Sequence, residues 1–147
     1  MTAHKESRVV PYSAALMFSI VADVEHYPDF LPWVAGMRLL SRETQGTKTI
    51  TMAEMLVGFR AYRERYTSRV TADETARTID VEQTQGVFRH LNNHWHFTPE
   101  GDGCRIDFTI DFAFRSRLLN AVAGSAFSHA LSQMTHAFEK RAAALSR

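Results

Sequence analysis

The sequence contains a single cysteine, Cys104, among its 147 residues. One cysteine excludes an internal disulfide and leaves no cysteine cluster for a structural zinc ion, which is compatible with a reducing compartment. No run approaches eighteen apolar residues, and the N-terminal stretch MTAHKESRVV has no apolar segment of the kind found in secretory signals. We therefore expect no membrane span, no signal peptide and a cytoplasmic location.

A strong charge of either sign is also missing. The 17 basic and 16 acidic side chains give a formal net charge of +1, so the chain has no global electrostatic footprint for nucleic acid, and DNA is not an expected partner. No Gly-rich phosphate loop, nucleophile elbow, internal repeat or low-complexity linker is visible. Apolar residues make up 45% of the chain, which predicts one globular domain over residues 1–147.

The N-terminal part of the sequence predicts one strand and two short helices. Residues 5–10 fit a strand that ends at Pro11. Ser13 is a suitable N-cap for a helix over 14–21, whose apolar residues fall at helical spacing. A second short helix is predicted over 24–30.

The remainder of the sequence predicts a sheet followed by a helix. Turn residues cut 34–114 into six strand-length pieces, and the last piece, 104–114, alternates strictly between apolar and other side chains. A broad apolar stripe over 117–146 predicts a long helix that must be covered on more than one side. The expected fold class is α+β: a curved antiparallel sheet of about seven strands around the long C-terminal helix, with two short helices after the first strand.

The stretch YPDFLPW, from Tyr27 to Trp33, gathers three aromatic rings, a leucine and two prolines where the prolines oppose regular structure. Phe30 and Leu31 could simply cap the core while the prolines fix a bend. The stretch joins the second short helix to the first strand of the meander, so it is expected beside the mouth of any cavity between sheet and helix. There Trp33 would suit a membrane interface, because it has an apolar body and a polar N–H group.

Several short motifs give the chain a resemblance to a known family. Their order and spacing are more specific than any one of them: YPDFLPW, Gly86-Val87-Phe88, Trp95-His96-Phe97, Cys104-Arg105-Ile106-Asp107-Phe108, Arg117-Leu118-Leu119 and Ala137-Phe138-Glu139-Lys140-Arg141-Ala142. With them the chain resembles the coenzyme Q-binding branch of the START-like (helix-grip) superfamily. That branch also contains the bacterial ribosome-association toxin, and it is loosely grouped with aromatic polyketide cyclases. Val34 and Val87 depart from a Cys and a Pro that are frequent in the family.

The resemblance implies a hydrophobic tunnel that holds a polyprenylated quinone such as ubiquinone, with no cofactor required. The implied function is sequestration or delivery of this lipid in support of respiration or quinone biosynthesis, with peripheral contact at the inner membrane. The expected wall and mouth residues are Phe30, Leu31, Trp33, Leu56, Phe59, Tyr62, Phe88, Trp95, Phe108, Phe112, Leu119, Val122, Phe127 and Leu131. The alternative for each of them is an ordinary place in the core.

Candidate catalytic and metal-binding residues are few. His90, His94 and His96 share one face of a strand, but the opposite face looks like core, so the histidines are expected to point to solvent rather than to bind a metal. Cys104 lies on the apolar side of its strand with no predicted activating partner, which indicates a buried, unreactive thiol. We therefore expect no metal site and no catalysis.

Two glutamates leave an enzyme as an alternative. Glu54 and Glu64 alternate with apolar or aromatic neighbours, and a carboxylate that faced an apolar cavity would have a raised pKa and could act as an acid or base. A small cyclase or hydrolase with one of these residues as its base is the corresponding hypothesis. A contact between Arg60 and Glu64 along the strand is the structural alternative.

Three arginines form a local basic stripe. Arg63, Arg65 and Arg69 share one face of a strand, which could be a solvated face balanced by acids on neighbouring strands. Clustered arginines also suit an anionic membrane surface or rRNA phosphates. The toxin branch of the family implies a second hypothesis. In it, the protein binds the large ribosomal subunit and thereby blocks the joining of the two subunits.

Overall fold

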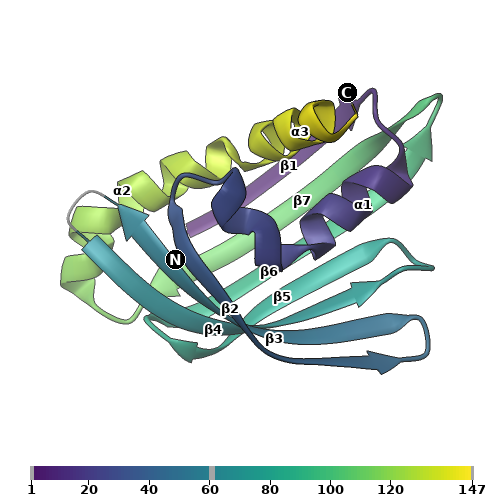
Figure 1. The fold of residues 1–147 in the computed structure, drawn as a ribbon. Helices are drawn as coiled ribbons and strands as arrows, with labels where there is room; N and C mark the ends of the chain where they lie inside the picture. The colour runs from purple at the N-terminus through teal and green to yellow at the C-terminus, as the bar shows by residue number, and fades with distance from the viewer. Residues whose placement is uncertain (1, 60–61, 147) are drawn as a thin grey trace.

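The computed structural model describes residues 2–59 and 62–146, and the side chains of these residues except for 2, 59, 62 and 122–124. Its elements follow the predicted order: β1 (Thr2–Val10), α1 (Ala14–Ala22), the 3-10 helix η1 (Val24–Asp29), β2 (Val34–Gln45), β3 (Lys48–Phe59), β4 (Tyr62–Asp73), β5 (Thr78–Gly86), β6 (Phe88–Glu100), β7 (Gly103–Phe114), α2 (Arg117–Ser132) and α3 (Met134–Leu145). The helices lie against one face of a strongly bent sheet (Figure 1). The α+β fold with a seven-stranded curved sheet is confirmed.

The sheet is antiparallel throughout, in the order β1-β7-β6-β5-β4-β3-β2. The six strands from β2 to β7 form the predicted meander, and β1 pairs with β7 from Thr2 opposite Phe112 to Val10 opposite Cys104. β1 and β2 are therefore neighbours in the sequence but lie at opposite edges, and α1 and η1 bridge them. Gly103 allows the β1–β7 junction, because a Cβ atom there would lie 2.0 Å from the carbonyl oxygen of Val10.

Local chemistry explains how the N-terminal helices begin and end. The Ser13 hydroxyl accepts a hydrogen bond from the Leu16 N–H at 3.1 Å, which confirms the predicted N-cap of α1. The Tyr27 hydroxyl donates to the carbonyl oxygen of Val21 and so fastens η1 to the end of α1. The chain leaves η1 at Phe30, and the Val34 N–H donates to the Leu31 carbonyl at the start of β2.

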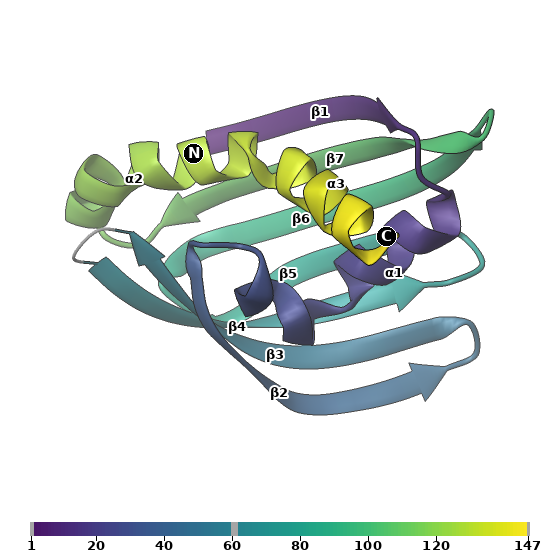
Figure 2. The ribbon, with the colours of Figure 1, turned by 45° about the horizontal axis from the view of Figure 1, so that its top comes forward.

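The C-terminal helix is not continuous, and this corrects the prediction of one long helix over 117–146. The N–H of Gln133 donates to the Ala130 carbonyl at 3.1 Å, a tighter turn than an α-helix allows, and α2 and α3 run in different directions on either side of it (Figure 2). The break places α3 against β1, where the Thr135 hydroxyl donates to Glu6 at 2.7 Å and Glu139 pairs with Arg8 at 3.0 Å. Neither contact is visible in the helical pattern of the sequence.

The core fills the space between the sheet and the helices. Phe138 of α3 is fully buried, and its ring lies 5.3 Å from each of the rings of Tyr27, Phe30 and Trp95. A second aromatic group joins α2 to β6 and β7, and it consists of Phe88, Phe112, Phe114 and Phe127. None of the helices in 2–59 and 62–146 combines the length and apolarity needed to cross a bilayer.

Candidate ligand-binding site

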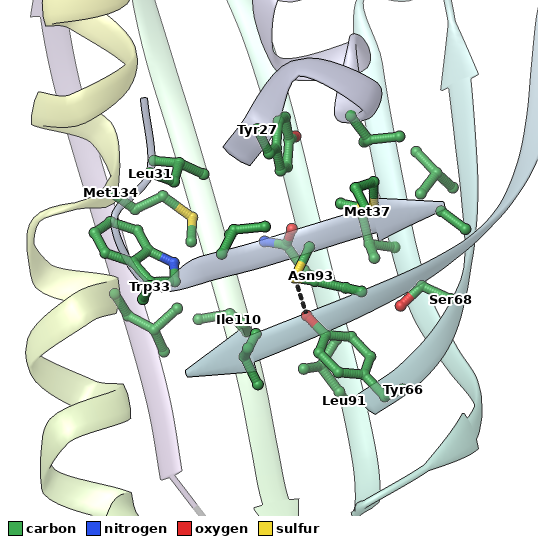
Figure 3. A pocket seen from close by; sticks show the side chains of 18 of the residues that line it. Tyr27, Leu31, Trp33, Met37, Tyr66, Ser68, Leu91, Asn93, Ile110 and Met134 are labelled. Atoms are coloured by element: carbon green, nitrogen blue, oxygen red, sulfur yellow. Dashed lines mark hydrogen bonds between the residues drawn. The ribbon is translucent and has the colours of Figure 1, made fainter. Parts of the chain in front are cut away.

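A cavity of about 70 Å³ lies between the sheet and the helices. Its wall combines η1 and the following loop, the inward faces of strands β2 to β7, and side chains of α2 and α3 (Figure 3). The volume is several times the ~10–15 Å³ that one water molecule needs, but well below the ~300–1,000 Å³ of pockets for drug-sized ligands. As it stands, the cavity accepts only a small group, and a larger ligand requires its wall to move.

Three methionines make such movement easy. Met37 of β2, Met55 of β3 and Met134 of α3 all line the cavity, and they come from three separate elements. Methionine has an unbranched, flexible side chain that repacks around differently shaped neighbours at little energetic cost. The cavity can therefore widen without disrupting the sheet or the helices.

Three polar side chains on the sheet, Tyr66, Ser68 and Asn93, line the cavity. The Tyr66 hydroxyl donates to the thioether sulfur of Met55 at 3.1 Å, and burial raises the pKa of this phenol, so it remains a protonated donor at neutral pH. Ser68 is 6% exposed, and within the described part of the chain its hydroxyl oxygen has no hydrogen-bond partner. The Asn93 amide donates to the Thr109 carbonyl at 2.9 Å and accepts from the Trp95 indole N–H at 2.8 Å.

The sequence interpretation did not single out Ser68 or Asn93, although a signal was present. Asn93 stands between Leu91 and Trp95, and Ser68 stands between Tyr66 and Val70, each at the two-residue spacing of an inward strand face. Because a buried polar side chain usually has a hydrogen-bond partner, a polar residue on an otherwise apolar strand face indicates a candidate binding residue.

An open groove of about 1020 Å³ lies outside the cavity. Its lining includes Phe30, Pro32 and Trp33 of the chain after η1, and side chains of α2 and α3. Trp33 lines both the groove and the cavity and so stands at the boundary between them. The Arg141 guanidinium lies 5.1 Å from the centre of the Phe30 ring, a cation–π contact that joins α3 to the loop.

The structure distributes the predicted wall and mouth residues over several places. Five line the cavity: Leu31, Trp33, Trp95, Phe127 and Leu131. Phe30 lines the groove. Four are buried in the core but are not among the described residues that line the cavity: Phe88, Phe108, Phe112 and Leu119. The side chains of Phe59, Tyr62 and Val122 lie outside those that the structure describes.

Leu56 lies on the outer face of the sheet. In the register between β3 and β4 it stands opposite Arg65, which is exposed, whereas the neighbouring residues Met55 and Val57 point inward and line the cavity. Because side chains of a strand alternate between the two faces, Leu56 cannot share a wall with Met55 and Val57. The prediction of Leu56 as a wall residue is therefore wrong, and its neighbours Met55 and Val57 line the cavity instead.

The two glutamates are not brought to the cavity. Glu54 lies on the outer face of β3, where it forms an ion pair with Arg38 at 3.5 Å. Glu64 is half-buried near the start of β4 and is not among the described residues that line the cavity. The predicted contact of Glu64 with Arg60 involves a residue outside the described ranges. Neither glutamate is among the described residues that line the cavity.

The histidines and the cysteine lie apart from the cavity as well. His90 pairs with Asp111 at 3.2 Å and His94 with Asp80 at 2.6 Å, both across strands, and His96 is exposed. Cys104 is buried, and burial raises the pKa of its thiol, which lowers its reactivity.

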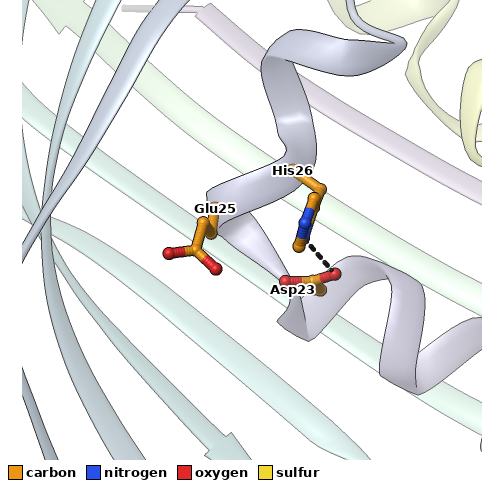
Figure 4. Close-up of side chains that lie close together, drawn as sticks. All are labelled: Asp23, Glu25 and His26. Atoms are coloured by element: carbon orange, nitrogen blue, oxygen red, sulfur yellow. Dashed lines mark hydrogen bonds and ion pairs between the residues drawn. The ribbon is translucent and has the colours of Figure 1, made fainter.

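One group of possible metal ligands occurs within 2–59 and 62–146: Asp23, Glu25 and His26, at the junction of α1 and η1 (Figure 4). All three are exposed to solvent, and His26 Nδ1 lies 2.7 Å from an Asp23 carboxylate oxygen. This hydrogen bond raises the pKa of His26, with a further contribution from the Asp23 charge. Asp23 and His26 therefore bind each other, and nothing further in the structure marks the group as a cation site.

The basic stripe faces solvent. Arg63, Arg65 and Arg69 are exposed, and alternation along β4 puts them on the face opposite Tyr66 and Ser68. Arg69 forms an ion pair with Glu82 of β5 at 2.6 Å. The stripe is thus partly balanced by acid at one end.

The sequence of this chain is similar to those of several known proteins. A family model described as polyketide cyclase / dehydrase and lipid transport matches residues 10–139. The ribosome association toxin RatA of Rickettsia prowazekii is 33% identical over 145 residues, which are 97% of each chain. The mitochondrial coenzyme Q-binding protein COQ10 homolog B of Xenopus laevis is 36% identical over 143 residues, and this chain spans 57% of its length.

Solved structures with the same fold are also known. The solution structure of the 18 kDa protein CC1736 from Caulobacter crescentus has a TM-score of 0.81 and 41% identity, with 99% of each chain covered. The Zhui aromatase/cyclase from a Streptomyces species has a TM-score of 0.80 over 99% of this chain and 96% of its own. At 19% identity, the likeness to the cyclase shows a shared fold alone.

Proposed function

The chain belongs to the polyketide cyclase/dehydrase and lipid transport family, and from this premise we propose that it binds an apolar, quinone-like lipid between its sheet and its C-terminal helices. The observation that carries the proposal is the methionine-lined apolar cavity that meets a large groove at Trp33. A binding protein needs apolar wall more than a catalytic group. The described residues that line the cavity supply that wall and contain no carboxylate, histidine or cysteine.

The free energy gained by burying the hydrocarbon of a lipid is large enough for binding. Each methylene removed from water gains about 0.8 kcal/mol, so ten of them contribute roughly 8 kcal/mol, enough for micromolar binding before other costs. The small cavity takes the part of the ligand that displaces the methionine side chains, and the groove takes the rest. We propose that the bound lipid is sequestered or delivered without chemical change.

Extraction of the purified protein with organic solvent, followed by mass spectrometry, tests this function. We expect a quinone or related polyprenyl lipid in the extract, and saturable binding of an added polyprenyl benzoquinone by protein stripped of lipid. A parallel extraction of an unrelated protein purified in the same way controls for carried-over membrane lipid. Recovery of no lipid together with no saturable quinone binding would overturn the proposal.

A second candidate function is association with the large ribosomal subunit. Its support is the relative named as a ribosome association toxin, which matches over 97% of both chains, together with the exposed Arg63 and Arg65 on the outer face of β4. A patch of arginines suits rRNA because each one can neutralise a phosphate. This function would use the outer face of the sheet, and the lipid site would lie on the inner face.

Charge reversal at Arg63 and Arg65 tests the second function. If both side chains contact rRNA phosphates, changing both to Glu should weaken co-sedimentation with large subunits and lower the salt slope of binding by about two. Arg42→Glu, an exposed arginine on the edge strand β2, is the matched control. Equal co-sedimentation of the control, the double variant and the native protein at every salt concentration would exclude this surface.

A further inference from the structure

We propose that the ligand enters head first: a neutral, oxygen-bearing head group hydrogen-bonds to Ser68 and Tyr66 at the sheet side of the cavity, and its apolar tail leaves past Trp33 into the groove. The inference rests on the proposed lipid-binding function. It adds the chemical class of the head group, an uncharged carbonyl or hydroxyl, and the direction in which the molecule lies.

The main support for this head-group site is Ser68. Ser68 is buried, yet within the described residues its hydroxyl has no hydrogen-bond partner. Figure 3 shows this oxygen turned toward the other side chains of the wall rather than into the sheet. A buried hydroxyl without a partner has lost its hydration and gained no hydrogen bond, so an oxygen from a ligand would remove a penalty.

Tyr66 supplies a second hydroxyl from the same face of β4, two residues away. It donates to the sulfur of Met55, and a thioether is a weak acceptor. A ligand carbonyl would be a stronger acceptor for the same hydrogen, and Met55 is free to turn away because its side chain is flexible. The amide nitrogen and the amide oxygen of Asn93 each have one hydrogen-bond partner. Each can form one more hydrogen bond, because the nitrogen has a second N–H and the oxygen a second lone pair.

The charge of the head group follows from what the cavity lacks. Among the described residues that line it, none carries a charged side chain. A carboxylate or phosphate placed beside Ser68 would lose its hydration and gain no cation, which is far costlier than burying a neutral oxygen with a hydrogen bond. The position beside Ser68 therefore fits the head group of a quinone, a phenol or an alcohol, and it disfavours a carboxylate or a phosphate there.

The direction of the tail follows from the position of Trp33. This residue lines both cavity and groove, on the helix side of the cavity, whereas Ser68 and Tyr66 belong to the sheet (Figure 3). Beyond Trp33 the groove is lined in part by polar or charged side chains, among them His129, Lys140 and Arg141. It also presents small side chains of α2 and α3, including Ala126, Ala130 and Ala137, at spacings of three to four residues or their multiples. Small residues at such spacing leave a channel along the helices in which a hydrocarbon chain can lie.

Binding of a short-chain dimethoxybenzoquinone to lipid-stripped protein, measured by calorimetry, tests the head-group site. If one hydrogen bond is lost in each, Ser68→Ala and Tyr66→Phe should each weaken binding by about three- to tenfold. Ser68→Thr retains the hydroxyl and should bind nearly as the native protein does. Tyr12→Phe removes a phenol outside the cavity and is the matched control; thermal unfolding of every variant verifies the fold.

Two further ligands test the class and the direction. Stearyl alcohol should bind, and stearate at neutral pH should bind at least tenfold more weakly. Ala137→Trp, which fills the groove, should weaken a long-tailed quinone while leaving the short-chain quinone unchanged. If both quinones and the alcohol fail to bind the native protein, the lipid-binding function and this inference both fall. If they bind but Ser68→Ala and Tyr66→Phe match the native protein, or stearate binds as well as the alcohol, only the head-first inference falls.

Discussion

Replacement of Phe138 by alanine is expected to lower the free energy of unfolding by about 3–5 kcal/mol, the usual cost of removing a large buried aromatic side chain. Phe138 is 0% exposed, and its ring is 5.3 Å from the rings of Tyr27, Phe30 and Trp95. The single side chain thus joins α3 to η1, to the loop after it and to β6. Its removal opens a cavity that these three elements cannot all close at once.

Urea unfolding followed by tryptophan fluorescence measures this loss. For a chain of this size, each kcal/mol corresponds to about 2–4 °C in the melting temperature, so thermal unfolding gives an independent value. Leu145→Ala on the same helix is the matched control, since Leu145 is 53% exposed and its truncation should change stability by less than about 0.5 kcal/mol. Similar losses in the two variants would show that α3 packs on the sheet in another way.

The helices and strands were largely predictable because their signals are local. The strict alternation of 104–114 became β7, and Ser13 became the N-cap of α1. The break of the C-terminal helix at Gln133 was not predictable in the same way, because the helix beyond it packs against Glu6 and Arg8 of the first strand. Those residues are more than 120 positions away in the sequence, and no helical pattern records them.

Which apolar residues face a cavity was harder to predict than which are buried. In β3, apolar residues occur at both even and odd positions, so alternation did not decide between Leu56 and its neighbours. The register with β4, where Leu56 stands opposite Arg65, decides it. Phe88, Phe108 and Phe112 are as buried as the cavity residues, and only the packing of distant elements separates filled core from open space.

Replacement of Ala53 by leucine should nearly abolish ligand binding while preserving the fold. Ala53 is 3% exposed, lines the cavity and is the cross-strand partner of Ser68 in the β3–β4 register. Side chains at such paired positions lie about 5 Å apart, so the added carbons would occupy the space in front of the Ser68 hydroxyl. A ligand kept from burying four methylene equivalents loses about 3 kcal/mol, or roughly 200-fold in affinity.

Equilibrium binding of a short-chain benzoquinone to lipid-stripped Ala53→Leu, with the native protein and Ala35→Leu in parallel, decides this prediction. Ala35 is exposed on β2, so the same substitution there adds the same carbons outside the cavity and should leave the affinity unchanged. Because extra carbons in a packed core can cost about 1–3 kcal/mol, each variant must first show a native melting transition. Val70→Leu, on the neighbouring wall, provides a second blocked cavity if Ala53→Leu is unstable. Native affinity in a folded blocked variant would mean that the ligand is held outside the cavity, in the groove that shares Trp33 with it.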